Sequence, residues 1–467
     1  MKRIIILLFV LGCIAQEPFR FEYYEPKDTA LTIGPNEPLE FSCIAYNVKT
    51  PQLLYTWYVN DEKVSETPEY TFTKGEGEYN VIIEVSDGET AIFRQWSVTV
   101  VSAPDFEKIQ KTLERLRGLT FVEPVNRVVL DRNQMREELL IDLEESREDI
   151  LAEQKLYTAL HVWDPHRDLF RDYIDMYTAQ VASYYDTGDH TFYEVVEPGE
   201  PLAYREFVAA HELLHALQDQ HSYLDFETEN DDTYLAFLCV VEGDAMYHQF
   251  AYLYKMTQSE RKILLEYVNA LDIPVVNRFL ENLLMLRYDL GYVFVTDMSS
   301  NIDKVYERLP ASSEQVMHPE KYEQNEVPVT VEIPSVPGWE LVTENVFGEA
   351  FIMTFLKEHI AADTAAQAAA GWGGDTYAYY EKGNNYLLVV NTSWDTESDA
   401  AEFLKAYYDF TISWSENTLK KTGRLYETPT GFLALIQNKT QVIIVESPSR
   451  EAVDTVLSLM GFSLHIL

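Results

Sequence analysis

The chain has 467 residues, 46% of them hydrophobic and 13% aromatic, so it is long enough for two or three domains with substantial cores. Its 77 acidic residues outnumber its 36 basic residues and give a formal net charge of -41. A surface this acidic repels phosphate groups, which excludes nucleic acid and anionic lipid headgroups as expected partners.

The first 16 residues have the pattern of an export signal. Two basic residues precede an apolar run, residues 4–11, and a small-residue junction that ends at Cys13. Eight apolar residues are too few to span a bilayer, so we expect cleavage and not a retained membrane helix. Cleavage before Cys13 leaves a cysteine that can be lipidated, and cleavage after Ala15 is the alternative. We therefore expect an extracytoplasmic protein, anchored at the cell surface by a lipid or else secreted, with no other membrane contact.

Residues 27–102 alternate short apolar strands with turn clusters, a spacing typical of a small all-β sandwich. The predicted strands are residues 39–43, 54–59, 79–85 and 95–100. The strand Trp57-Tyr58-Val59-Asn60 and the turn Val85-Ser86-Asp87-Gly88 resemble the Ig-like modules of the PKD type. The resemblance implies a spacer or adhesion module without catalytic residues of its own.

A mainly helical region is predicted over residues 104–335. Helical periodicity begins at Phe106 and again near Asn133, and two apolar runs around Gly188 predict a β-hairpin. The predicted hairpin strands are residues 181–186 and 191–196. A further helix is expected over residues 259–286, interrupted near Pro274 because proline removes a helical hydrogen bond.

The motif His211-Glu212-Leu213-Leu214-His215 has the H-E-x-x-H pattern and lies in a stretch without glycine or proline, residues 205–220. Histidines four residues apart lie on one helix face, so both imidazoles can bind one zinc ion. Glu212 lies about 100° further round the helix. Its carboxylate is thus placed off the metal but within reach of a water bound to it, as a general base requires.

Glu242 is the first candidate for a third zinc ligand. It lies in an apolar predicted helix, residues 234–256, where a carboxylate is costly unless it is paired or bound to metal. Gly243 and Ala245 are expected to let this helix approach the H-E-x-x-H helix closely.

Two histidines are weaker candidates. His221 follows His215 by six residues, which places it away from the metal face if the helix continues, and no glycine is present to break the helix. His248 lies six residues beyond Glu242 and is expected to face elsewhere.

The H-E-x-x-H motif followed by a helical Glu242 resembles the gluzincin type of zinc metallopeptidase. Three longer strings, residues 211–220, 241–245 and 312–322, are similar to a group of archaeal and bacterial H-E-x-x-H proteins. The resemblance implies a Zn²⁺ cofactor, hydrolysis of peptide bonds and a peptide or protein substrate. It also implies that a strand of the hairpin before the metal helix lines the substrate cleft.

Hydrolysis at zinc also needs a hydrogen-bond donor for the developing oxyanion, and His318 or Tyr322 can supply one. The alternative is that His318-Pro319 forms a structural turn. Asp219 is a candidate partner for a ligand histidine, with an ordinary surface position as its alternative.

The last part, residues 336–467, contains a strand–strand–helix unit twice and predicts a two-layer α+β subdomain. The first unit comprises residues 376–380, 386–391 and 398–408. The second unit comprises residues 432–437, 441–446 and 449–460, with an additional strand over residues 424–428.

These patterns predict an exported zinc peptidase with His211, His215 and Glu242 as ligands and Glu212 as the general base. The alternative is a cell-surface binding protein, or a pseudoenzyme that keeps the fold, in which any metal is structural. Two histidines and one glutamate favour the enzyme, because they leave one coordination position open. The sequence leaves the substrate, the cleavage specificity and the oligomeric state open.

Overall fold

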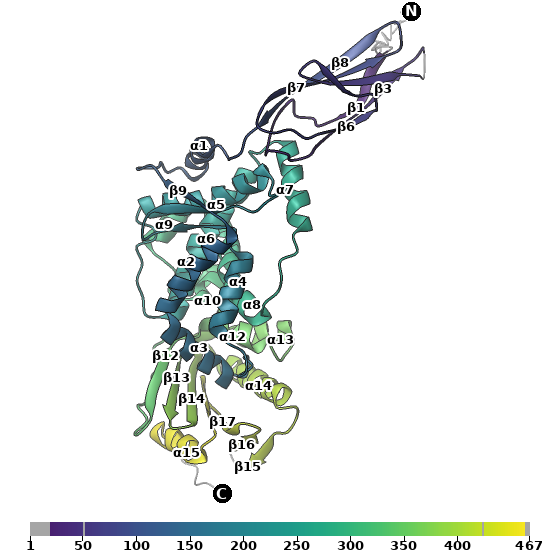
Figure 1. Cartoon of the computed structure of the whole chain (residues 1–467). Helices are drawn as coiled ribbons and strands as arrows, with labels where there is room; N and C mark the ends of the chain where they lie inside the picture. Colours follow the sequence, from purple (N-terminus) through teal and green to yellow (C-terminus); the bar gives the residue numbers. More distant parts are fainter. Residues whose placement is uncertain (1–18, 50–51, 423–424, 463–467) are drawn as a thin grey trace, which may run out of the picture. The chain divides into compact units, whose positions relative to one another are not determined.

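The computed structural model describes residues 19–49, 52–422 and 425–462. The predicted export signal and Cys13 lie outside these residues. An N-terminal all-β region is followed by a helical middle and by a C-terminal region built on a β-sheet (Figure 1). The expected multidomain order is therefore confirmed. In the described part of the chain, no helix combines the length and apolar character needed to span a membrane.

The N-terminal region contains eight strands: β1 (Phe19–Glu25), β2 (Ala30–Ile33), β3 (Leu39–Asn47), β4 (Leu54–Val59), β5 (Glu62–Ser65), β6 (Glu69–Phe72), β7 (Gly77–Ser86) and β8 (Ala91–Val100). They form a sheet in the order β1-β3-β6 and a second in the order β2-β8-β7-β4-β5. Side chains from both sheets share one core around Trp57 and Trp96, whose ring centroids lie 5.8 Å apart. The four strands predicted from alternation are β3, β4, β7 and β8.

The helical middle contains α1 (Phe106–Arg117), β9 (Asn126–Leu130), α2 (Arg132–Glu145), α3 (Arg147–Ala159), α4 (Leu169–Gln180), β10 (Ser183–Asp186), β11 (Thr191–Val195), α5 (Leu202–Gln220), α6 (Asp231–Leu253), α7 (Gln258–Ala270), α8 (Arg278–Met298), the 3₁₀ turn Ser299–Asn301, α9 (Ile302–Glu307), α10 (Ser313–Met317) and α11 (Pro319–Gln324). The predicted hairpin is β10–β11, and β9 pairs with β11 in parallel. The predicted interruption near Pro274 falls between α7 and α8.

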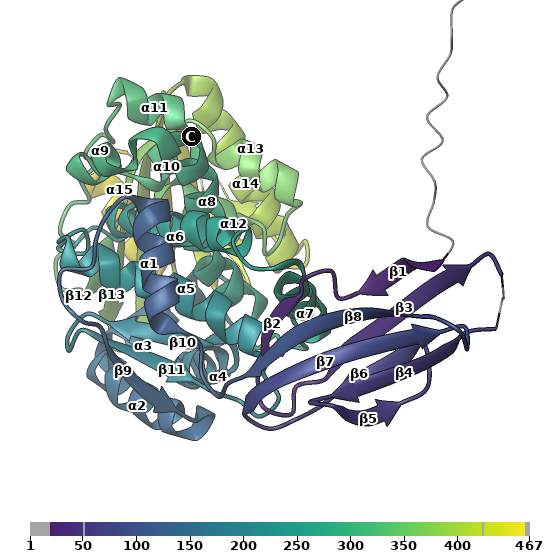
Figure 2. The ribbon, with the colours of Figure 1, turned by 90° about the horizontal axis from the view of Figure 1, so that it is seen from above.

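Two glycines bring α6 and α8 into backbone contact. A Cβ atom at Gly243 would lie 2.2 Å from the carbonyl oxygen of Gly291, and one at Gly291 would lie 2.2 Å from that of Cys239. Gly243 was expected to admit the H-E-x-x-H helix, but it admits α8. Figure 2 shows α5, α6 and α8 grouped together. The close contact fixes the position of α8 beside the helix that carries Glu242.

The C-terminal region contains β12 (Glu340–Asn345), α12 (Gly348–Leu356), α13 (Ala362–Ala369), β13 (Trp372–Lys382), β14 (Asn385–Trp394), α14 (Glu397–Trp414), β15 (Lys420–Thr422), β16 (Leu425–Thr428), β17 (Gly431–Asn438), β18 (Gln441–Ser447) and α15 (Arg450–Leu459). The sheet order is β12-β13-β14-β18-β17-β16-β15. The two predicted strand–strand–helix units are β13–β14–α14 and β17–β18–α15.

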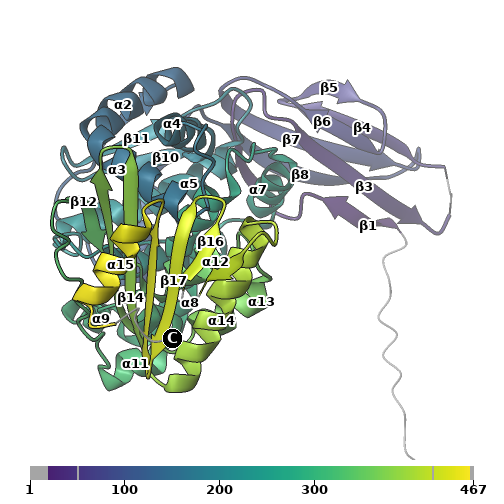
Figure 3. The same ribbon diagram turned by 90° about the horizontal axis from the view of Figure 1, so that it is seen from below.

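The prediction of two layers is wrong, because helices cover both faces of this sheet (Figure 3). Leu388 and Val390 of β14 pack in one cluster with residues of α14 such as Phe403. Leu387 and Val389 point to the opposite face and pack in a second cluster that includes α15. The region is therefore a three-layer structure with the sheet in the middle.

The chain divides into two compact units. The first contains the described residues up to Glu107 with the segments Pro198–Phe207 and Leu253–Leu271, and the second contains the remaining described residues from Lys108 onward. The second unit holds both the helical middle and the C-terminal sheet, because one hydrophobic cluster contains residues of α3, α8, α12 and β14. All the groups discussed below belong to this second unit.

Candidate metal centre

The H-E-x-x-H motif lies in the middle of α5, as predicted. Ala210, Leu213, Leu214 and Leu217 on this helix are buried, with at most 1% of their surface exposed. After a connection over residues 221–230, Asn230 caps the start of α6 by accepting a hydrogen bond from the backbone N–H of Thr233 at 2.9 Å. The chain thereby returns along α6 and brings Glu242 opposite the two histidines.

The three side chains meet at their polar atoms. His211 Nε2 lies 3.2 Å from Glu242 Oε2 and 3.2 Å from His215 Nε2, and His215 Nε2 lies 3.4 Å from Glu242 Oε2. Each of the three side chains has only 12–13% of its surface exposed. The structure thus brings together the two histidines and the carboxylate that ranked first from sequence. We call His211, His215 and Glu242 the metal cluster.

The spacing of these atoms fits a zinc ion. Zinc bonds histidine nitrogen and carboxylate oxygen at about 2.0–2.2 Å, and a tetrahedron of that size separates its donor atoms by about 3.3 Å. The three observed separations of 3.2, 3.2 and 3.4 Å have this length. Two imidazoles and one carboxylate form a donor set typical of catalytic zinc sites, and they leave a fourth position open.

Histidine and carboxylate also stabilise each other's charge. Burial favours a higher pKa for Glu242, but the imidazoles of His215 and His211 hold that pKa well below its ordinary value. Burial favours a lower pKa for His215, but the Glu242 carboxylate outweighs it and raises the pKa to about 9. The metal-free cluster therefore holds a proton that a bound cation would displace.

Gln218 orients His215 and was not predicted as a site residue. Its Oε1 atom accepts a hydrogen bond from His215 Nδ1 at 2.8 Å, which places the proton on Nδ1 and leaves Nε2 free to bind metal. Gln218 Nε2 donates to the carbonyl oxygen of Val241 at 3.0 Å and to Tyr306 Oη at 3.0 Å. The amide is 1% exposed, so these partners fix its orientation.

A buried ion pair supports Gln218 from behind. Asp244 Oδ2 accepts hydrogen bonds from Gln218 Nε2 at 3.3 Å, from Tyr306 Oη at 3.2 Å and from Arg117 Nε at 3.0 Å. Arg117 also pairs with Asp303 at 2.7 Å. Asp244 and the Arg117 side chain are nearly inaccessible to solvent. The metal cluster is thus backed by a paired and hydrogen-bonded charge network, as buried charges require.

Replacing Gln218 by leucine is expected to weaken zinc binding about 10- to 100-fold, because leucine cannot accept the proton of His215 Nδ1. Competition with a chromophoric chelator measures the affinity. Gln220→Leu is the matched control: Gln220 lies two residues further along α5 and accepts from the backbone N–H groups of Val122 and Glu123 instead. Equal zinc affinity in the two variants would show that Gln218 does not position His215.

Glu212 lies beside both the cluster and the hairpin. The side chain is 9% exposed and lies near the backbone N–H of Tyr185 in β10. Burial raises its pKa, although the imidazoles of His211 and His215 oppose this shift. A carboxylate with a raised pKa is suited to accepting a proton near neutral pH.

Asp219 anchors the hairpin to α5. Its Oδ2 atom accepts hydrogen bonds from Tyr185 Oη and from His190 Nδ1, both at 2.7 Å. Asp219 is therefore neither the partner of a ligand histidine nor an ordinary surface residue. It holds in place the strand whose backbone contacts Glu212.

Tyr288 of α8 is the second group that the sequence did not indicate. Its hydroxyl lies close enough to Glu242 to feel the charge of that carboxylate, and its ring centroid lies 6.3 Å from that of His211. Burial and the Glu242 charge raise its pKa far above the ordinary value, so the hydroxyl keeps its proton. Tyr288 is thus a neutral donor beside the cluster, whereas the expected donors were His318 and Tyr322.

His318 and Tyr322 have other partners. His318 Nε2 lies 3.0 Å from the buried Glu349, and the residue joins the end of α10 to the start of α11. Tyr322 donates to the carbonyl oxygen of Arg308 at 2.8 Å. These contacts favour the structural-turn alternative for His318-Pro319 over a catalytic function.

The remaining histidine candidates also lie in other contacts. His221 Nε2 is 3.0 Å from the carbonyl oxygen of Thr120. His248 is buried, and its Nδ1 is 2.9 Å from the carbonyl oxygen of Asp244. Among the described residues, His221 and His248 contribute no atom to a group of potential metal ligands.

One further group of carboxylates could hold a cation, and a lysine already occupies it. Glu314, Glu326 and Asp395 surround Lys321 Nζ at 2.6, 2.9 and 2.6 Å. The ammonium group offsets part of the negative charge of the three carboxylates, so together they form a structural ion-pair network.

Comparison with known proteins covers only parts of the chain. A domain of unknown function, DUF8575, matches residues 338–457, which do not include the metal cluster. Curated proteins provide no match. A solved structure with a similar segment is that of a Bacteroides fragilis protein described as an alpha-galactosidase, with 12% identity and a TM-score of 0.14. The match covers 24% of this chain and 28% of that one, and a likeness this low carries no argument.

Proposed function

We propose that this protein is an exported zinc peptidase of the gluzincin type. The observation that supports it most is the triangle of His211, His215 and Glu242, whose edges of 3.2–3.4 Å suit one tetrahedral zinc ion with an open position. The carboxylate of Glu212 beside this triangle favours a hydrolase over a structural metal site. The N-terminal all-β region serves as a PKD-type spacer in this proposal, and the predicted export signal would carry the protein out of the cytoplasm.

When bound, zinc polarises the scissile carbonyl group and makes water a stronger nucleophile. Glu212 accepts the proton of the attacking water on its carboxylate and returns it to the leaving amine. Tyr288 donates its hydroxyl proton in a hydrogen bond to the oxygen that gains charge.

The hairpin offers a place for an extended peptide. β10 is an edge strand of the sheet β10-β11-β9, so one side of its backbone is not paired within that sheet. A substrate strand can add to this edge by main-chain hydrogen bonds. Because the backbone of Tyr185 in β10 contacts Glu212, a peptide bound there would pass close to the general base.

Incubation with a mixed peptide library tests the function directly. We expect new peptide ends, identified by mass spectrometry, that disappear after treatment with a chelator and return when zinc alone is restored. The positions of the new ends also distinguish an endopeptidase from an exopeptidase. A chain that binds one zinc ion but leaves a broad library intact would favour the binding-protein alternative.

A further inference from the structure

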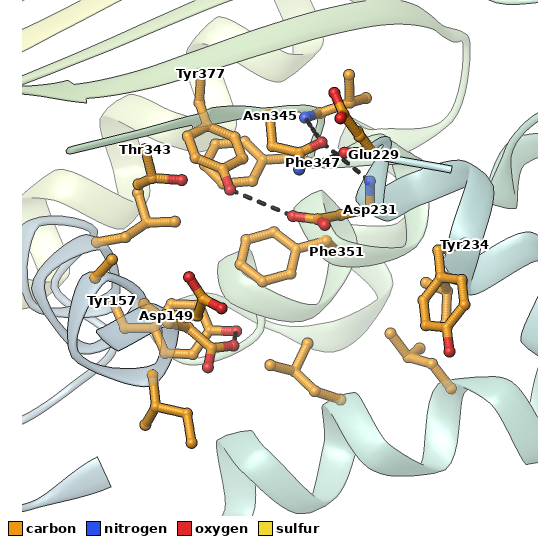
Figure 4. Close-up of a pocket in the computed structure, with 18 of the residues that line it drawn as sticks. Asp149, Tyr157, Glu229, Asp231, Tyr234, Thr343, Asn345, Phe347, Phe351 and Tyr377 are labelled. Carbon is orange, nitrogen blue, oxygen red and sulfur yellow. Dashed lines mark hydrogen bonds between the residues drawn. The ribbon is translucent and has the colours of Figure 1, made fainter. Parts of the chain in front are cut away.

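A cavity of about 1020 Å³ lies within the second compact unit. The described residues that line it do not include His211, His215 or Glu242. Its walls come from α3, α6, α8, β12, α12 and β13. This volume is at the upper end of the range for natural ligand sites. Figure 4 shows the rings of Phe347, Phe351 and Tyr377 at one side of the cavity. The stacked pairs Phe347–Phe351 and Phe347–Tyr377 have centroid distances of 4.8 and 4.1 Å.

Four acidic residues are among the described residues that line the cavity, and two of them, Glu153 and Asp231, accept hydrogen bonds from tyrosine hydroxyl groups. Glu153 accepts hydrogen bonds from Tyr157 and from Tyr173, the latter at 2.9 Å, so both of its oxygens are engaged. Asp231 accepts from Tyr377 at 3.4 Å (Figure 4). These carboxylates are therefore partnered without the help of a cation.

Arg287 is the exception among the polar groups of the cavity. Among the described residues that line the cavity it is the one basic residue. It is half-buried, and its Nε atom is buried without a hydrogen-bond partner. Within residues 19–49, 52–422 and 425–462, Arg287 makes no hydrogen bond or ion pair. The chain has 77 acidic residues and only 36 basic ones, so carboxylate partners are abundant. A buried donor without an acceptor is uncommon and needs an explanation.

The position of Arg287 connects the cavity with the metal cluster. Arg287 precedes Tyr288, whose hydroxyl lies near the charge of Glu242. Leu238 of α6 also lines the cavity and lies one helical turn before Glu242. Helix α6, which carries Glu242, and helix α8, which carries Tyr288, thus also form walls of the cavity.

We propose that Arg287 binds a carboxylate of the ligand that enters this cavity. A guanidinium group presents two parallel N–H donors that match a carboxylate. The terminal nitrogens of Arg287 are not among its buried atoms and have no acceptor among the described residues, so they can meet a carboxylate in the cavity. The apolar side chains of Leu286 and Phe351 in the same lining suit an apolar residue beside that carboxylate. The proposed peptidase function is needed only for the further step that the ligand is a peptide cleaved at the metal cluster.

Binding of two small probes, an acid and the corresponding amide, tests the proposal without any hydrolysis. N-acetyl-L-phenylalanine and its amide differ only in the carboxylate, and each is titrated calorimetrically into the full chain in zinc-free buffer, so that no metal competes for it. We expect the acid to bind roughly tenfold more tightly than the amide. Arg287→Gln should reduce that ratio to about one, and Arg287→Lys should retain part of it, because lysine keeps the charge but not the fork.

Arg278→Gln is the matched control, since Arg278 begins the same helix and does not line the cavity. It should behave as the wild type does. A second pair, N-acetyl-L-glutamic acid α-amide and N-acetyl-L-glutamine amide, shows whether Arg287 also accepts a side-chain carboxylate. Equal affinity for acid and amide in both pairs, or a preference that survives Arg287→Gln, would overturn the proposal. A chain that cleaves nothing but keeps the Arg287-dependent preference would refute only the peptidase function.

Discussion

Replacing Glu242 by alanine is expected to abolish tight zinc binding, whereas His221→Ala should leave it nearly intact. Glu242 supplies one corner of the triangle and the charge that offsets the cation, while His221 bonds to the backbone of Thr120. Loss of a partner that only orients a ligand already costs about 10- to 100-fold in metal affinity, so loss of the ligand itself should cost more than about 100-fold. Equilibrium dialysis followed by metal analysis measures both variants.

Glu242→Gln separates ligation from folding in this experiment. Glutamine keeps the volume of the side chain between α5 and α6 but removes the negative charge. We expect a folded chain, verified by circular dichroism, with zinc affinity close to that of the alanine variant. If His221→Ala were the variant that lost zinc, the assignment of the cluster would be wrong.

Replacing Glu212 by glutamine is expected to lower peptide hydrolysis by about 10²- to 10⁴-fold, the usual contribution of a general base. Zinc affinity should change little, because the carboxylate of Glu212 is not part of the metal cluster. The measurements are the turnover of a peptide identified from the library and the zinc content of the same sample. Glu227→Gln in the connection between α5 and α6 is an exposed control with the same charge change.

Stability provides a second readout for Glu212→Gln. Burial raises the pKa of Glu212, which means that the folded state disfavours its ionised form. Glutamine removes this cost, and its side chain has nearly the same size and keeps one oxygen that accepts hydrogen bonds. We therefore expect the variant to unfold at the same temperature as the wild type or at a higher one, as is common for catalytic groups. Lower activity together with clearly lower stability would point to a structural function instead.

Local patterns in the sequence identified the parts of the site that have a fixed spacing. Two histidines one helical turn apart on a helix without breaks, and a glutamate in an apolar helix, led to the three residues that the structure brings together. Gln218 and Tyr288 carry no such signal. Gln218 interacts with residues of α6 and α9, and Tyr288 reaches Glu242 only because Gly243 and Gly291 allow α8 to approach. Such contacts depend on tertiary packing.

The layering of the C-terminal region was missed although the sequence contains a signal for it. Residues 387–390 and 442–445 are continuous apolar runs, whereas a strand with one wet face alternates apolar and polar residues. Continuous apolar runs are typical of strands buried on both faces. In the structure, β14 and β18 are buried on both faces. The strand–strand–helix repeat was correct, but the repeat does not determine which face each helix covers.

Anomalous diffraction at the zinc absorption edge, from crystals of the full mature chain, shows directly whether the metal cluster binds zinc. We predict one strong peak within bonding distance of His211 Nε2, His215 Nε2 and a carboxylate oxygen of Glu242, with no protein atom in the fourth position. A peak at any other place, a fourth protein ligand that closes the site, or no peak in crystals soaked with zinc would contradict it.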